Sequence, residues 1–82
     1  MFHKIKSVIV KDNLIIEAIF EDNERRQYDI NKIINKWKIF KKLEDRNLFE
    51  KVKVDVGGHG ISWNENIDLS SEEIWENGVE VK

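Results

Sequence analysis

The sequence predicts one small α+β domain over residues 1–82: an antiparallel sheet, made of an N-terminal three-strand meander and a C-terminal hairpin, with two or three short helices on it. Runs that alternate apolar and polar residues precede residue 30 and follow residue 52, as in half-buried strands. Between them the apolar period changes to that of a helix. A chain of 82 residues, 40% hydrophobic, suits a single folded domain with one core.

The first three predicted elements are strands joined by tight turns. A strand over Ile5 to Val10 leads to an Asp12-Asn13 turn, since both residues tolerate left-handed backbone. The next strand, Leu14 to Phe20, has every second residue apolar and should turn that face to the core. A turn with Asn23 at positive φ then reverses the chain into a strand over 25–30.

Helical signals fill the middle of the chain. Apolar residues at i, i+3, i+4 and i+7 predict a buried helical stripe made of Ile30, Ile33, Ile34 and Trp37. Asp29 or Asn31 is expected to cap this helix, which should end near residues 37–39. Asp45 is the expected cap of a second, short helical turn that points Leu48, Phe49 and Val52 inward.

A glycine-rich stretch carries the most specific backbone demands. Val52, Val54 and Val56 alternate with polar residues and predict a strand buried on one face. The glycines Gly57, Gly58 and Gly60 predict a tight or bulged connection that requires positive φ, followed by a strand over 61–63. The same G-x-G pattern could cradle a phosphate only if a helix followed it, and here a strand follows.

The C-terminal part predicts a turn, a strand and a helix. Residues 64–66 form the turn, with Asn66 as a structural turn residue, and residues 67–69 form the strand. Ser70 and Glu73 fit a capping box for a helix that ends at residues 77–78. Asp68 is expected to tie down the turn or the start of this helix. Residues 79–82 are expected to form a frayed tail.

Residues along most of the chain, roughly 5–75, carry a family resemblance. They are Val8, Leu14, Phe20, Asp29, Phe40, Leu43, Phe49, Val52, the Gly57-Gly58 pair, Ile61, Trp63, Asp68 and Leu69. This order resembles the small bacterial "domain of unknown function 2442" proteins, for which a compact α+β fold is expected. Asn23 and Asn66 stand where the family often has glycine, and Lys38 or Ile39 replaces another glycine before Phe40. Asparagine is the best substitute for glycine at left-handed positions.

The resemblance implies an interaction role rather than a reaction. Members are small proteins, often encoded beside another short protein, and some carry a helix-turn-helix. This suggests a protein-interaction or antitoxin-like regulatory function, with the partner encoded by a neighbouring gene. A homo-oligomer is an alternative assembly, because an uncovered sheet edge can pair with a second copy.

No catalytic or metal-ligating set stands out, and we expect no cofactor. His3 and His59 are the only histidines and there is no cysteine, so the usual zinc-ligand spacings are absent. Asp55 and Asp68 could form a carboxylate pair, although acids on a solvated sheet face are commoner. An enzyme with a site near His59 is therefore the weakest alternative. The protein is not expected to be an enzyme.

Charge is segregated along the chain. Residues 32–53 carry eight Lys and Arg against three Asp and Glu, whereas residues 54–82 carry one against seven. The acidic segment predicts contact with a basic partner through Trp63, Glu65, Asp68, Glu72 and Glu76, with Trp63 a binding residue only if it is exposed. The basic segment gives the alternative of a nucleic-acid-associated module that uses Lys32, Lys36, Lys38, Lys41 and Lys42. The net charge of −2 weighs against this alternative.

No apolar run approaches the roughly 20 residues that span a bilayer, so no membrane contact is expected. The first residues lack the apolar core of a signal peptide. These features predict a cytoplasmic protein.

Overall fold

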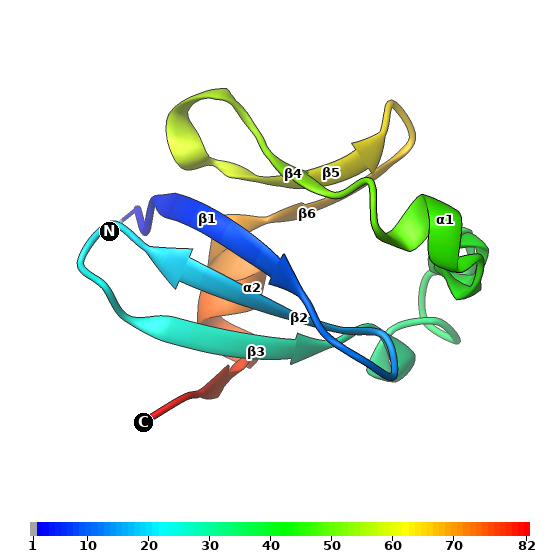
Figure 1. The fold of residues 1–82 in the computed structure, drawn as a ribbon, viewed down its shortest axis with the longest axis horizontal. Helices are drawn as coiled ribbons and strands as arrows, with labels where there is room; N and C mark the ends of the chain where they lie inside the picture. The colour runs from blue at the N-terminus through cyan, green and yellow to red at the C-terminus, as the bar shows by residue number, and fades with distance from the viewer. Residues whose placement is uncertain (1) are drawn as a thin grey trace.

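Two antiparallel sheets enclose the core in the computed structural model, which describes residues 2–82 (Figure 1). The strands are β1 (Ile5–Val10), β2 (Ile15–Phe20), β3 (Arg25–Asp29), β4 (Lys53–Val54), β5 (Gly60–Asn64), β6 (Ile67–Ser70) and β7 (Val79–Glu80). The α-helices are α1 (Arg46–Phe49) and α2 (Ser71–Asn77), and the 3₁₀ helices are η1 (Ile30–Lys32), η2 (Lys38–Glu44) and η3 (Val56–Gly58). The predicted α+β class, with its meander and C-terminal hairpin, is confirmed, and the hairpin lies in a second sheet rather than in the sheet of the meander.

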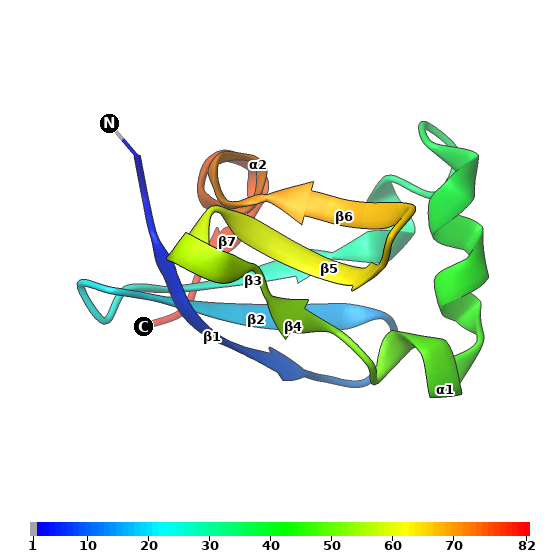
Figure 2. The ribbon, with the colours of Figure 1, turned by 90° about the horizontal axis from the view of Figure 1, so that it is seen from above.

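The larger sheet has the order β1-β2-β3-β7 and the smaller one the order β4-β5-β6. β1 contacts β4, while α2 packs against both β3 and β6. Figure 2 shows α2 at one end of β6 and η2 with α1 at the other end of the molecule. The fully or nearly buried apolar residues are Ile5, Ile16, Ala18, Phe20, Tyr28, Ile30, Ile33, Phe40, Leu43, Phe49, Ile61, Trp63, Ile67, Leu69 and Ile74. Both sheets and the helices therefore share one core.

The meander follows the predicted alternation. Ile16, Ala18 and Phe20 are buried, and Asn23 has φ 69° in the turn between β2 and β3, as predicted. In the first turn Asn13 is left-handed as expected, but Leu14 is too, with φ 60°. The second strand therefore begins one residue later than the alternation suggested, at Ile15.

The predicted amphipathic helix over residues 30–39 is wrong. η1 covers Ile30–Lys32, turns follow, and η2 runs through Lys38–Glu44. Ile30 and Ile33 are buried as the stripe predicted, because a 3₁₀ turn also brings residues i and i+3 together. The β-branched isoleucines favour a helix only weakly, so tertiary burial decides the backbone. Trp37 is extended, with φ −130° and ψ 97°, and its side chain is 40% exposed.

Caps that depend on a short polar side chain occur where the sequence placed them. Asp29 accepts a hydrogen bond from the backbone N–H of Asn31, Asp45 accepts from that of Asn47, and Ser70 accepts from that of Glu73 at 3.1 Å. The reciprocal half of the capping box is not made, since the carboxylate of Glu73 binds Tyr28 instead. The predicted frayed tail is also wrong, because β7 pairs with β3.

The glycine turn meets two different demands. Gly57 and Gly58 have φ of 84° and 73°, as predicted. Gly60 is not left-handed; a Cβ there would lie 2.4 Å from the carbonyl oxygen of Leu69 on β6. The expectation that Val56 faces the core is wrong, since its side chain is 98% exposed where the chain leaves β4 for η3.

The turn between β5 and β6 is held by an unexpected residue. Asn64 Oδ1 accepts hydrogen bonds from the backbone N–H groups of Asn66 and Ile67, at 2.8 and 3.0 Å. Asn66 itself has no positive φ, so it does not replace a left-handed glycine. Asp68 ties down neither this turn nor the start of α2, because Asn64 and Ser70 do so.

Candidate interaction surface at the seam between the sheets

β3 and β6 belong to different sheets and do not pair with each other. We call the surface between them, lined by residues of β3, β6, α2 and the segment 32–40, the seam. α2 bridges β3 and β6 at one end of it. Two hollows open on the seam, one toward β3 and one toward β6, and Glu73 lines both. Residues of β3, the segment 32–40, β6 and α2 thus meet at one surface.

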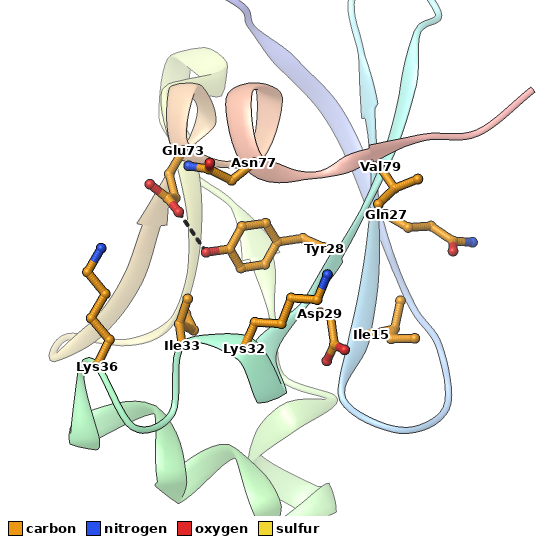
Figure 3. A pocket seen from close by; sticks show the side chains of 10 residues that line it. All are labelled: Ile15, Gln27, Tyr28, Asp29, Lys32, Ile33, Lys36, Glu73, Asn77 and Val79. Atoms are coloured by element: carbon orange, nitrogen blue, oxygen red, sulfur yellow. Dashed lines mark hydrogen bonds between the residues drawn. The ribbon is translucent and has the colours of Figure 1, made fainter.

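The first hollow, of about 520 Å³, lies between β3, η1 and α2 (Figure 3). The hydroxyl of Tyr28 donates to Glu73 Oε2 at 2.8 Å. Burial first, and then this carboxylate, raises the pKa of Tyr28 well above its ordinary value. The phenol therefore stays protonated near neutral pH and offers a fixed hydrogen-bonding group rather than an acid or base. Lys32 and Lys36 also line the hollow.

The second hollow, of about 350 Å³, lies between residues 37–40 and β6. Trp37, Ile39, Phe40 and Leu69 form its apolar wall. Trp37 and Ile39 are 40% and 38% exposed, which is unusual for large apolar side chains beside a core. The ionisable side chains that line this hollow, Asp68 and Glu73, are both acidic.

Sequence reasoning missed Trp37 and proposed Trp63 instead. Trp63 is 4% exposed and donates its indole N–H to the carbonyl oxygen of Phe49 at 3.0 Å, so it belongs to the core and cannot serve as a surface hot spot. Trp37 was assigned to a buried helical stripe that does not form. Its signal in the sequence was its position among lysines, and Lys36 Nζ lies 4.5 Å from the centroid of its ring.

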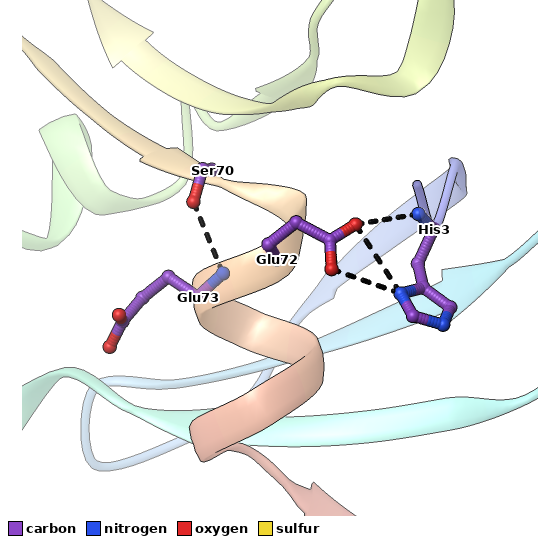
Figure 4. A network of polar contacts seen from close by, with 4 residues as sticks. All are labelled: His3, Ser70, Glu72 and Glu73. Atoms are coloured by element: carbon purple, nitrogen blue, oxygen red, sulfur yellow. Dashed lines mark hydrogen bonds and ion pairs between the residues drawn. The ribbon is translucent and has the colours of Figure 1, made fainter. Parts of the chain in front are cut away.

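The four acidic candidates are separated by the fold. Asp68 lines the second hollow, and Glu65 lies exposed in the neighbouring turn. Glu76 is exposed on α2. Glu72 is engaged within the chain: its carboxylate accepts the backbone N–H of His3 at 2.7 Å and lies 3.1 Å from His3 Nδ1 (Figure 4). These bonds lower the pKa of Glu72, the backbone bond contributing most.

His3 fixes the start of the described chain to α2. Its ring stacks on that of Trp75 with centroids 3.7 Å apart, and Arg26 lies over Trp75 at 4.0 Å. Glu72 is therefore a residue that holds the N-terminal segment in place, not a free partner-binding acid.

The five candidate lysines are exposed but do not share one α-helical face. Lys32 and Lys36 lie at the first hollow (Figure 3), together with Asp29 and Glu73. Lys38, Lys41 and Lys42 lie on η2. Lys32 and Lys36 of the basic segment therefore meet Glu73 of the acidic segment at the seam.

The groups considered for catalysis take part in different contacts. His59 is exposed and stacks on Phe2, with centroids 4.3 Å apart. Asp55 accepts a hydrogen bond from Ser62 Oγ at 2.7 Å, while Asp68 lines the second hollow. Within residues 2–82 no group of three or more His, Cys, Asp or Glu side chains could hold a metal ion. The same residues contain no helix long and apolar enough to cross a membrane.

The family model described as "Protein of unknown function (DUF2442)" matches residues 5–80. The chain belongs to the DUF2442 family. Comparison of this DUF2442 chain with curated proteins and with solved structures gives no match. The family's description gives no function, so the seam is interpreted from its own geometry.

Proposed function

We propose that the protein is a small cytoplasmic bacterial interaction module that binds another small protein, as the antitoxin-like or regulatory half of a two-protein pair. The observation that supports this most is the exposure of Trp37 and Ile39 beside Asp68 and Glu73. Interfaces are enriched in aromatic side chains at their centres, and tryptophan is a frequent hot spot. The two acids favour a partner that presents basic residues.

Co-expression with the protein encoded by the neighbouring gene tests the proposal. The wild-type chain should co-purify with it at low salt, and Trp37→Ala should weaken the complex by about tenfold or more, as expected for a hot spot. Val56→Ala is the matched control, because Val56 is 98% exposed at the glycine turn, away from the seam. A wild-type chain that binds no neighbour-encoded protein would overturn the proposal, as would a complex unaffected by Trp37→Ala.

A nucleic-acid-associated role is the second candidate. It is supported by the five exposed lysines, which take part in none of the ion pairs among residues 2–82. Binding to phosphates would weaken steeply as salt rises. Triple replacement of Lys32, Lys36 and Lys38 by Glu should abolish a low-salt shift of duplex DNA or RNA. No shift of the wild-type protein at low ionic strength ends this candidate.

A further inference from the structure

We infer that the open edge of β6 binds an extended segment of the partner by strand addition, and that this segment alternates apolar, basic and apolar residues. The inference rests on the proposed interaction function and specifies how the partner is held. β6 is an edge strand of the smaller sheet. Three features of this edge carry the inference: its free backbone groups, its apolar floor and its charge.

The backbone of Asp68 points away from its own sheet. Asp55 N–H donates to the carbonyl oxygen of Gly60 at 2.9 Å, so β5 uses the backbone groups of Gly60 and Ser62 to bind β4. Ser71 N–H donates to the carbonyl oxygen of His59 at 2.8 Å, so the intervening residues of β5 bind β6. Asp68 is paired with Ser62, whose groups face β4. By this alternation the N–H and C=O of Asp68 lie on the outer edge.

These edge groups are left open by the described chain. No turn or loop of residues 2–82 makes a backbone hydrogen bond to Asp68, and its side chain has no partner there. Asp68 is exposed, whereas Ile67 and Leu69 on either side of it are buried. An added strand would therefore place the residue opposite Asp68 on the outer face and its two neighbours toward the inside.

An apolar floor lies where those inward side chains would go. Trp37, Ile39 and Phe40 line the second hollow together with Leu69, and Leu69 lies on β6 itself. Apolar residues before and after the central position of the incoming segment would cover the exposed parts of Trp37 and Ile39. Main-chain hydrogen bonds would give the affinity, and the hollow would select the side chains.

Charge selects a basic residue at the central position and disfavours a second copy of this chain. Asp68 is the one ionisable residue of β6. Side chains directly opposite in an antiparallel pair lie about 4.5–5.5 Å apart, so Lys or Arg would be attracted. In the symmetric antiparallel pairing centred on Asp68, the aspartates of the two copies would face each other, and like charges repel. A single edge acid therefore discourages this pairing of two copies and admits a cationic segment.

The test uses the ¹⁵N-labelled full chain and the peptide acetyl-Thr-Val-Arg-Val-Thr-amide at millimolar concentration. The Asp68 and Ser70 amides should shift and gain protection from hydrogen exchange. The same peptide with central Glu should bind about fivefold more weakly, and a peptide methylated on the central backbone nitrogen should not bind. Asp68→Lys should reverse the preference from the Arg to the Glu peptide, a result that no loss of folding can imitate.

Glu80→Lys on β7, the edge of the other sheet, is the matched control and should leave the preference unchanged. Peptide shifts outside β6 and residues 37–40, an unchanged preference in Asp68→Lys, or amide protection that rises with protein concentration alone would overturn the inference. A neighbour-encoded protein that binds while the Asp68 amide stays unprotected would overturn the strand addition and leave the interaction function standing. If no neighbour-encoded protein forms a complex with the chain, the proposed function is overturned. The peptide titration then tests the strand addition at β6 by itself.

Discussion

Replacement of Gly60 by Ala tests whether close strand packing, rather than left-handed backbone, requires this glycine. The added Cβ would lie 2.4 Å from the carbonyl oxygen of Leu69 and 3.2 Å from the Cα of Ser70. Ordinary contacts between carbon and oxygen are about 3.3–3.6 Å long, so β5 and β6 would have to separate by about 1 Å. Both neighbouring atoms belong to backbone and cannot rotate away.

The expected loss in the free energy of unfolding has two causes, the steric strain at residue 60 and the weakening of a hydrogen bond between neighbouring strands. Overpacking costs about 1–3 kcal/mol, and one weakened ladder hydrogen bond adds about 1 kcal/mol. We expect Gly60→Ala to lower the free energy of unfolding by about 3 kcal/mol. A domain of this length has about 4–12 kcal/mol in total, and the melting temperature should fall by about 12–24 °C.

Gly57 supplies the comparison because its requirement is different. Its φ is 84°, and a Cβ there would meet the ring of His59, an exposed side chain that can move. Gly57→Ala should cost about 1–2 kcal/mol, and Gly57→Asn less, because asparagine tolerates left-handed backbone. Asparagine should give Gly60 no such relief. Urea unfolding followed by tryptophan fluorescence and far-ultraviolet circular dichroism measures all four variants. Equal or smaller destabilisation by Gly60→Ala than by Gly57→Ala would refute the reasoning.

Two further predictions concern buried polar groups. Trp63→Phe removes the indole N–H that binds the buried carbonyl oxygen of Phe49 and leaves a small void. The free energy of unfolding in urea should therefore fall by about 2–3 kcal/mol. A fall of less than about 1 kcal/mol would contradict the role of this hydrogen bond. Glu17 is 4% exposed on the outer face of β2, and its bonds from Gln27 and then Arg25 lower its pKa below the ordinary 4.5. Its contribution to stability is therefore fully present above about pH 4.5 and is lost as the pH falls through the lower folded pKa. Gln27→Ala should raise that pKa in a ¹³C NMR titration of the Glu17 carboxyl, and an unchanged titration would exclude the hydrogen bond as the cause.

Local signals predicted local structure well in this chain. Asn23 adopts positive φ, and Asp45 and Ser70 cap the helices that follow them. Each of these outcomes depends on one side chain and the backbone within three residues of it. Such short-range bonds form whatever the rest of the fold does, so the sequence contains enough information to place them.

The same reasoning failed where a residue had two uses. Glu73 could complete a capping box or bind Tyr28, 45 residues away, and the longer-range bond formed. Trp37 fitted a helical stripe, but the spacing of Ile30 and Ile33 also fits a 3₁₀ turn. The seam was missed for this reason, since its exposed tryptophan follows from the backbone of residues 33–38.

The α+β class, the meander and most of the turns and caps could be predicted from the sequence, because these depend on periodicity and on neighbours along the chain. The family could be recognised from the order of particular residues, which resembles that of the family. The tertiary structure alone decided that Trp63 is buried and Trp37 exposed, that Gly60 is needed for close packing, and that Glu72 holds His3. It also brought Asp68 to an open edge beside an apolar hollow. These features depend on which strands become neighbours, and that is set by burial of the whole core rather than by any single stretch of residues.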